Sequence, residues 1–120
     1  MHMEKAFETE SYVSVDAAWH QALSFDEPCP VKVVIENLGE DPIYGFYLDE
    51  ADFNAMIEHG SVDETVMARI EKQQLCVNEH GVAESEVLFR AGKYYVCVEL
   101  DVESSPQAKR SEFKLVLYEK

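Results

Sequence analysis

The stretch VLFRAGKYYVCVEL, residues 87–100, decides the fold class of this chain. It predicts two strand segments joined by a tight bend at Gly92, because a residue without a Cβ suits such a bend. In the second segment the side chains alternate between two faces, as in a strand that is buried on one side. One face carries Tyr94, Val96, Val98 and Leu100, and the other carries Tyr95, Cys97, Glu99 and Asp101. We expect the first of these faces to lie in the core.

Similar alternation recurs along most of the chain. It predicts further strands at residues 7–15, 17–25, 31–36, 43–48, 65–77, 82–89 and 113–117. Residues 17–25 also fit one face of a helix, and a strand is preferred there because the neighbouring β segments need a partner. Turn residues separate most of these segments. The pattern predicts a mainly β protein, an antiparallel β-sandwich of about seven or eight strands.

A single short α-helix is expected at about residues 49–59. Asp49 is a suitable N-cap, Asp52 places a carboxylate in the first turn, and Gly60 follows the expected end. The apolar residues of this segment recur at helical spacing and would pack on the sheet. They are Phe53, Met56 and Ile57.

Length and composition indicate one domain spanning residues 1–120, with residues 1–5 either disordered or a cloning scar. The chain has 24 acidic and 10 basic residues, and a formal charge of −14. Nucleic acid and anionic membranes attract clustered positive charge, so direct binding to either is not expected. A partner protein with a basic surface is compatible with this charge, although solubility alone also accounts for it.

No catalytic, metal or cofactor site is expected from the motifs. The three cysteines, Cys29, Cys76 and Cys97, form no C-x-x-C pair, and the histidines lack the spacing of a zinc-binding helix. The sequence leaves open whether the cysteines are all reduced or include one disulfide. It also leaves open whether acidic residues bind calcium, although the interleaved loop of a calcium-binding EF-hand is missing. The candidate interaction surface is the acidic set Glu40, Asp41, Asp49, Glu50 and Asp52.

Two segments resemble a known group of sandwich domains. Residues 92–96 read Gly-Lys-Tyr-Tyr-Val, and residues 47–53 begin Tyr-Leu-Asp and end in Phe. The pattern is similar to that of bacterial pre-peptidase C-terminal domains and of the related emp24-like GOLD domains. The resemblance implies a jelly-roll accessory domain without a catalytic centre, in which Leu48, Phe53, Gly92, Tyr94 and Tyr95 serve the framework.

We therefore expect a non-catalytic protein-interaction or accessory binding module rather than an enzyme. The alternative is a small acidic inhibitor or nucleic-acid mimic that blocks a basic groove on an enzyme that handles DNA or RNA. The sequence shows no leader peptide and no membrane-spanning run, which favours the cytoplasm. Secretion or a periplasmic location is expected instead if a leader has been removed.

Overall fold

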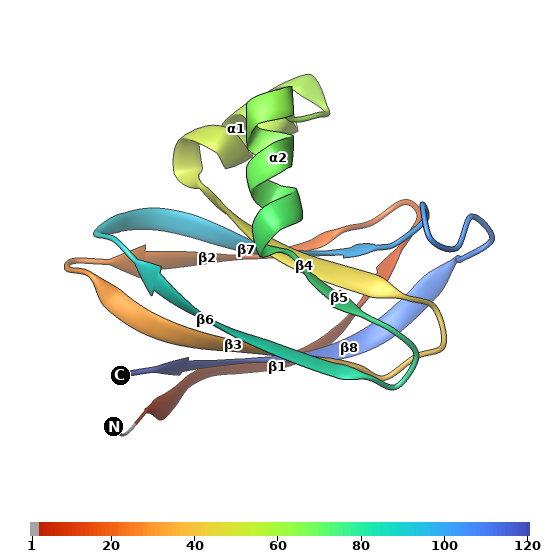
Figure 1. Cartoon of the computed structure of the whole chain (residues 1–120), viewed down its shortest axis with the longest axis horizontal. Helices are drawn as coiled ribbons and strands as arrows, with labels where there is room; N and C mark the ends of the chain where they lie inside the picture. Colours follow the sequence, from red (N-terminus) through yellow and green to blue (C-terminus); the bar gives the residue numbers. More distant parts are fainter. Residues whose placement is uncertain (1–2) are drawn as a thin grey trace.

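The computed structural model describes residues 3–120 and shows two four-stranded antiparallel sheets packed face to face (Figure 1). Two helices lie outside the sandwich on one of the sheets. In chain order the elements are β1 (Glu4–Ser14), β2 (Trp19–Phe25), β3 (Cys29–Asn37), β4 (Ile43–Asp49), α1 (Glu50–His59), α2 (Glu64–Gln73), β5 (Leu75–Val77), β6 (Val82–Phe89), β7 (Gly92–Leu100) and β8 (Arg110–Glu119).

The strand order is that of a jelly roll. One sheet runs β1-β8-β3-β6 and the other runs β2-β7-β4-β5. Consecutive strands therefore alternate between the sheets for much of the chain, which wraps the two layers around one core. The sequence-based prediction of a mainly β, jelly-roll-like sandwich is confirmed. Of the segment 1–5, residues 1 and 2 lie outside the described part of the chain, while Glu4 and Lys5 pair with β8.

The core lies between the two sheets and is built from the inward residues of each strand. Its fully buried members include Val13, Ile43, Val98, Phe113 and Leu115. Each such side chain stabilises the fold by about 1.5–3 kcal/mol relative to an exposed position. The inward face predicted for the second half of residues 87–100 is confirmed, since Val96, Val98 and Leu100 are buried in this core.

The opposite face of β7 is also partly covered. Cys97 is buried although it points away from the sandwich core, because it belongs to a second apolar cluster beneath the helices. Alternation distinguishes the two faces of a strand, but it does not show whether the second face meets water or a helix. β7 is therefore buried on both faces over residues 96–98.

The prediction of one helix and of a strand at residues 65–77 is wrong. Residues 64–73 form α2, and only Leu75–Val77 is a strand, paired with β4. Asp63 caps α2 by accepting a hydrogen bond from the Val66 amide at 2.9 Å. Val66 and Ile70, four residues apart, are buried on one helical face, so the helical period decides the local structure here.

A buried asparagine joins four segments at one end of the sandwich. The Asn37 side-chain amide donates to the carbonyls of Asp41 and Val77 at 2.9 and 3.1 Å. Its oxygen accepts from the Gly39 amide at 2.9 Å and from the Ser111 hydroxyl at 2.7 Å. Asn37 is 1% exposed, so these bonds replace all contact of its side chain with water.

Candidate functional site

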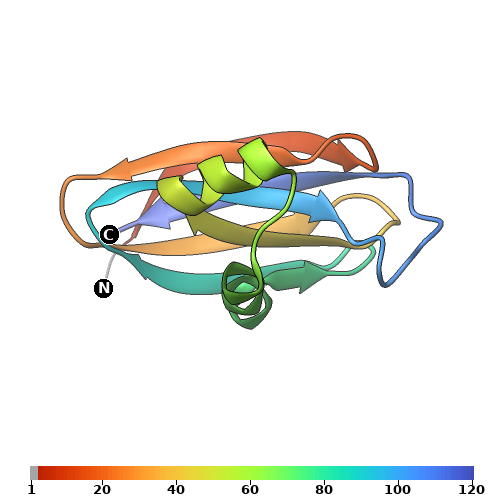
Figure 2. The same cartoon turned by 90° about the horizontal axis from the view of Figure 1, so that it is seen from above.

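The two helices cover part of the outer face of the β2-β7-β4-β5 sheet. The helices and the sheet enclose the apolar cluster of Phe46, Leu48, Phe53, Val66, Ile70 and Cys97. The rings of Phe53 and Tyr95 stack at 3.8 Å, which fixes α1 against β7. α1 lies along the sheet and α2 rises away from it, as Figures 1 and 2 show. The space between the helices and the uncovered part of the sheet is the candidate site.

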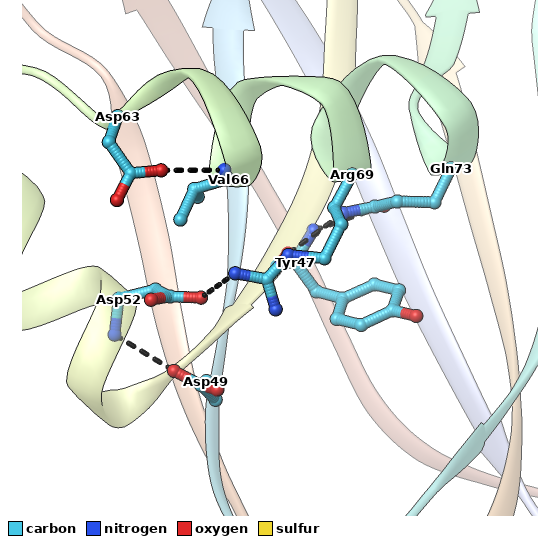
Figure 3. Close-up of polar contacts among 7 residues, drawn as sticks. All are labelled: Tyr47, Asp49, Asp52, Asp63, Val66, Arg69 and Gln73. Atoms are coloured by element: carbon cyan, nitrogen blue, oxygen red, sulfur yellow. Dashed lines mark hydrogen bonds and ion pairs between the residues drawn. The ribbon is translucent and has the colours of Figure 1, made fainter.

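Each helix begins at an aspartate cap and is placed by it. The Asp49 carboxylate accepts from the Asp52 amide at 2.8 Å, and Asp63 caps α2 in the same way (Figure 3). α1 ends at Gly60, whose φ of 75° lies in the left-handed region that favours glycine. The helix predicted at about residues 49–59 is confirmed with these caps. Of its expected apolar stripe, Phe53 is buried, Met56 is half-buried and Ile57 is exposed.

Two polar contacts hold α2 in position (Figure 3). The Gln73 side chain donates to the Tyr47 carbonyl at 2.8 Å and accepts from the Tyr47 amide at 3.3 Å. Tyr47 lies two residues beyond Gly45, the last β4 residue that pairs with β5. The Gln73 amide therefore satisfies the edge of β4 where the short β5 is no longer alongside it. Arg69 also forms an ion pair with Asp52 of α1 at 2.9 Å.

A cleft of about 450 Å³ lies between the helices, β4, β5 and the loop after β7. We call it the helix–sheet cleft. Its apolar lining includes Phe46, Met56 and Ile70, together with the aromatic ring and the aliphatic parts of other lining side chains. Its carboxylates come from α2, β7 and the loop that follows β7. They are Glu71, Glu99, Asp101 and Glu103.

Tyr44 and Glu99 form a half-buried polar pair in the cleft. The Tyr44 hydroxyl donates to Glu99 at 3.3 Å, across the register that places the two residues opposite each other on β4 and β7. Burial raises the pKa of Glu99 above its usual range, and the hydrogen bond from Tyr44 offsets part of that rise. Burial and the neighbouring Glu99 charge raise the pKa of Tyr44. The cleft thus holds a carboxylate that has lost much of its hydration, and within residues 3–120 no lysine or arginine forms an ion pair with it.

Exposed apolar side chains lie beside these carboxylates. Met67 of α2 and Val102 of the loop after β7 both line the cleft, and each is 44% exposed. Apolar surface rimmed by charge is typical of a protein-binding site. The chemistry of the cleft therefore suits a ligand with both an apolar and a cationic part.

A second hollow of about 330 Å³ lies on the other side of α2, lined by Tyr47, Tyr94, Arg69, Lys72 and the carboxylates of Asp49 and Asp52. Arg69 is already paired with Asp52 there. Opposite charges are mixed in this hollow, so it has no strong preference for the charge of a ligand.

The structure divides the five predicted acidic residues between two places. Glu40 and Asp41 lie in the loop before β4, whereas Asp49 is the last residue of β4 and Glu50 and Asp52 lie in α1. The strand between them has seven residues, which span roughly 20–24 Å. The Asp41 carboxylate accepts from the backbone amides of Lys109 and Arg110 at 3.0 and 3.3 Å, and Glu40 is exposed.

The three residues at the start of α1 lie close together. Asp49 caps the helix, Asp52 pairs with Arg69, and Glu50 pairs with Lys93 of β7 at 3.3 Å. These carboxylates hold local structure, and they lie outside the helix–sheet cleft. A binding role for the five residues stays a prediction.

The outer face of the other sheet mixes charges of both signs. Lys114 of β8 lies opposite both Glu10 of β1 and Glu36 of β3, and it bonds to Glu8 at 3.0 Å. Lys32 of β3 pairs with Glu84 of β6 at 3.4 Å. Lysines therefore interrupt the carboxylates on this face, whereas a mimic of nucleic acid needs continuous rows of negative charge.

The candidate metal ligands and nucleophiles are dispersed. Within residues 3–120, no group of three or more His, Cys, Asp and Glu side chains is placed to hold a metal ion. Cys29, Cys76 and Cys97 are all free thiols. Burial raises the pKa of the Cys97 thiol to about 12, so this thiol stays protonated near neutral pH. None of the helices in the described range has the length and apolar character needed to span a membrane.

Sequence reasoning missed the helix–sheet cleft, and part of its signal was visible. Glu99 and Asp101 follow Tyr95 and Cys97 on one face of β7, which placed carboxylates beside apolar residues. The contribution of Tyr44, Glu71 and the helices was not visible, because it depends on the pairing of β4 with β7 and on the existence of α2.

The fold has counterparts among solved structures. The chain matches the pre-peptidase C-terminal domain of a collagenase from Bacillus anthracis with a TM-score of 0.56 and 11% identity, over 92% of this chain and 87% of that one. It matches PliG, a periplasmic inhibitor of g-type lysozyme from Aeromonas hydrophila, with a TM-score of 0.55 and 11% identity, over 98% and 88% of the two chains. A protein of Triatoma virus matches with a TM-score of 0.52 and 7% identity, over 99% of this chain and 63% of that one.

The resemblance to pre-peptidase C-terminal domains inferred from the sequence is thus confirmed for the fold. The sequence matches no protein-family model. It also matches no curated protein. At these identities the structural matches establish shared architecture, and the chemistry of any site depends on the residues of this chain.

Proposed function

We propose that this chain is a non-catalytic binding module whose helix–sheet cleft receives a basic and partly apolar segment of another protein. The observation that carries the proposal is the combination, in one cleft of about 450 Å³, of an apolar lining with the desolvated Glu99 carboxylate. A lysine or arginine side chain matches both parts, because its stem is apolar and its head is cationic.

The Glu99 carboxylate supplies the specificity. Burial disfavours the charged form of Glu99. A cation from a partner would stabilise that charged form, because the cation replaces the lost hydration. A hydrogen bond to a charged group contributes about 1.5–3 kcal/mol, which corresponds to roughly a 10- to 150-fold change in affinity. The carboxylates of Asp101 and Glu103, in the loop after β7, would mainly accelerate association and make it sensitive to salt.

The scaffold favours binding over catalysis. The buried thiol of Cys97 is protonated near neutral pH, and the enclosed Tyr44 hydroxyl has a raised pKa, so neither is an activated nucleophile. The similar solved structures include a lysozyme inhibitor and the pre-peptidase C-terminal domain of a collagenase, which supports a module that acts through a partner.

The proposal is tested by calorimetric titration with a capped Leu-Arg-Leu-Arg-Leu peptide and with the same peptide in which citrulline replaces arginine. Citrulline keeps the shape of arginine and removes its charge. We expect the arginine peptide to bind at least about tenfold more tightly, and Glu99→Gln to remove most of that difference. Glu84→Gln, an equal change at an exposed site on β6, is the control. Equal binding of the two peptides, or equal effects of the two variants, would contradict the proposal.

A second candidate function is inhibition of an enzyme with a basic surface, and the match to a lysozyme inhibitor supports it. In this version the cleft covers part of the enzyme instead of a free peptide. The test is the rate of cell-wall hydrolysis by a g-type lysozyme at low and high salt, with Glu99→Gln as the variant. Loss of rate that weakens with salt supports inhibition, and an unchanged rate removes this enzyme class. Mimicry of nucleic acid has less support, because lysines interrupt the carboxylates of the β1-β8-β3-β6 sheet.

The inhibitor candidate favours a location outside the cytoplasm, since the matched inhibitor is periplasmic. The cytoplasmic location expected from the sequence has no such support. Separation of periplasmic and cytoplasmic fractions from cells that express the natural gene would decide between the two compartments.

A further inference from the structure

The two sheets end in four edge strands, and these edges differ in their charge. β1 and β6 are the edges of one sheet, and β2 and β5 are the edges of the other. β1 carries Glu8 and Glu10 and β6 carries Glu84 and Glu86, which discourage pairing with another chain. β5 has only three residues, and Gln73 satisfies the edge of β4 beyond it. These three edges are thus protected.

β2 lacks the charged side chains and the short length that protect these edges, although the Gln21 side-chain amide donates to the Ala22 carbonyl at 3.1 Å. Residues 17–25 read Ala-Ala-Trp-His-Gln-Ala-Leu-Ser-Phe and contain no Asp, Glu, Lys, Arg, Pro or Gly. All seven residues of β2 pair with β7 on one side, from Trp19 opposite Val98 to Phe25 opposite Gly92. In Figure 2 the strand forms the margin of the upper sheet. Within the described chain β2 is therefore a regular, uncharged strand with one edge unpaired.

An exposed apolar residue of α1 lies on the same side. Glu50 and Ile57 are seven residues apart and share one flank of the helix. Glu50 forms an ion pair with Lys93 of β7, and Lys93 lies opposite Ser24 of the neighbouring strand β2. We infer from this contact that the flank of α1 carrying Glu50 is directed toward β2. Ile57 is 63% exposed, and the helical period places it on this flank. A side chain from a strand added to β2 would find an apolar contact there.

We propose that the free edge of β2 accepts an extended segment of a partner protein as a fifth strand of the β2-β7-β4-β5 sheet. Backbone hydrogen bonds along the edge provide affinity in this mode of recognition, and alternate side chains provide specificity. The site is separate from the helix–sheet cleft, since α1 lies between β2 and α2 in Figure 2.

The charges at the two ends of β2 select the partner. Asp16 precedes the strand, and Asp26 and Glu27 follow it. Two copies paired antiparallel about Ala22 would bring Asp16 of one beside Glu27 of the other at both ends, and each chain carries a charge of −14. A second copy is thus disfavoured. The matching segment has about five to seven uncharged residues with lysine or arginine at both ends.

The experiment uses a capped Lys-Lys-Thr-Val-Thr-Val-Thr-Lys-Lys peptide and the isotope-labelled full chain. Amide exchange by NMR is expected to slow at β2 when the peptide is added, with shifts at β2 and Ile57. Ala22→Lys should weaken binding at least tenfold, whereas Ala6→Lys, the same change at an exposed position of β1, should leave it within twofold. Unchanged melting temperatures for both variants confirm that they fold.

A peptide N-methylated at alternate residues distinguishes strand addition from simple charge attraction. It keeps the four lysines and loses the amide donors of one edge, so its binding should be at least tenfold weaker. Equal binding of the two peptides, equal effects of the two variants, absence of change at β2 with millimolar peptide, or dimerisation of the chain through β2 would each overturn the proposal. Glu99→Gln should leave the peptide-induced shifts and the slowed exchange at β2 unchanged, so this readout at β2 is independent of any contact of the peptide with the helix–sheet cleft.

Discussion

Replacing Gln73 by methionine removes both of its hydrogen bonds to the Tyr47 backbone while keeping a side chain of similar length and good helix propensity. Each neutral hydrogen bond contributes about 0.5–1.5 kcal/mol net, so the variant should lose about 1–3 kcal/mol of unfolding free energy. The nitrogen–oxygen distance of the Arg69–Asp52 ion pair is shorter than that of one of the two Gln73 hydrogen bonds, but Arg69 is exposed at the surface. Arg69→Met should therefore lose less than about 1 kcal/mol.

The assay is urea unfolding of both variants, followed by the fluorescence of Trp19, the only tryptophan, whose ring packs against Phe113. Amide exchange at Tyr47 supplies a local readout. We expect faster exchange in Gln73→Met and little change in Arg69→Met. A larger loss of stability in Arg69→Met, or unchanged exchange at Tyr47 in Gln73→Met, would refute the inference that the glutamine amide holds α2 on the edge of β4.

Three further predictions concern buried polar groups. Asn37→Asp should lower the free energy of unfolding by about 2–6 kcal/mol near neutral pH, because two buried carbonyls lose their hydrogen-bond donor. Asn54→Asp, on the surface of α1, should change the free energy of unfolding by less than about 0.5 kcal/mol. Urea unfolding measures both values. Burial raises the pKa of Glu99 in the folded state above its value in the unfolded state. The contribution of Glu99 to stability is therefore fully present below the pKa of the unfolded state, and it is lost as the pH rises through the pKa of the folded state. Glu99→Gln should thus raise the melting temperature relative to the wild type at about pH 7 and not at about pH 4, and a higher gain at the acidic pH would contradict this sign. A maleimide should label the exposed Cys76 in the native protein and reach the buried Cys97 only after unfolding, as mass spectrometry can show.

The sandwich could be predicted because its main physical cause is local. Burial of one face imposes a two-residue period on each strand, and turn residues mark the ends of most strands. The helix at residues 50–59 was predictable for a similar reason, since Asp49 and Gly60 are strong end signals. The prediction failed at α2, where Val66, Ala68 and Ile70 fit a strand while Val66 and Ile70 also fit a helix. Packing against the sheet and the Asp63 cap decide that choice.

The helix–sheet cleft could not be predicted because its cause is not local. Tyr44 and Glu99 meet only through the register of β4 against β7, and Glu71 joins them only because residues 64–73 are helical. Some of the acidic residues that stood out in the sequence make local contacts in the fold. Asp49 caps a helix and Asp41 holds the backbone before β8.

The most direct test of the central claim is an NMR map of where the Leu-Arg-Leu-Arg-Leu peptide contacts the chain. We expect the largest shifts on residues of the helix–sheet cleft, with Tyr44, Met67, Glu99 and Val102 among them, and much smaller shifts with the citrulline peptide. Shifts spread evenly over the acidic surface, or concentrated at Glu8 and Glu84 of the other sheet, would contradict it.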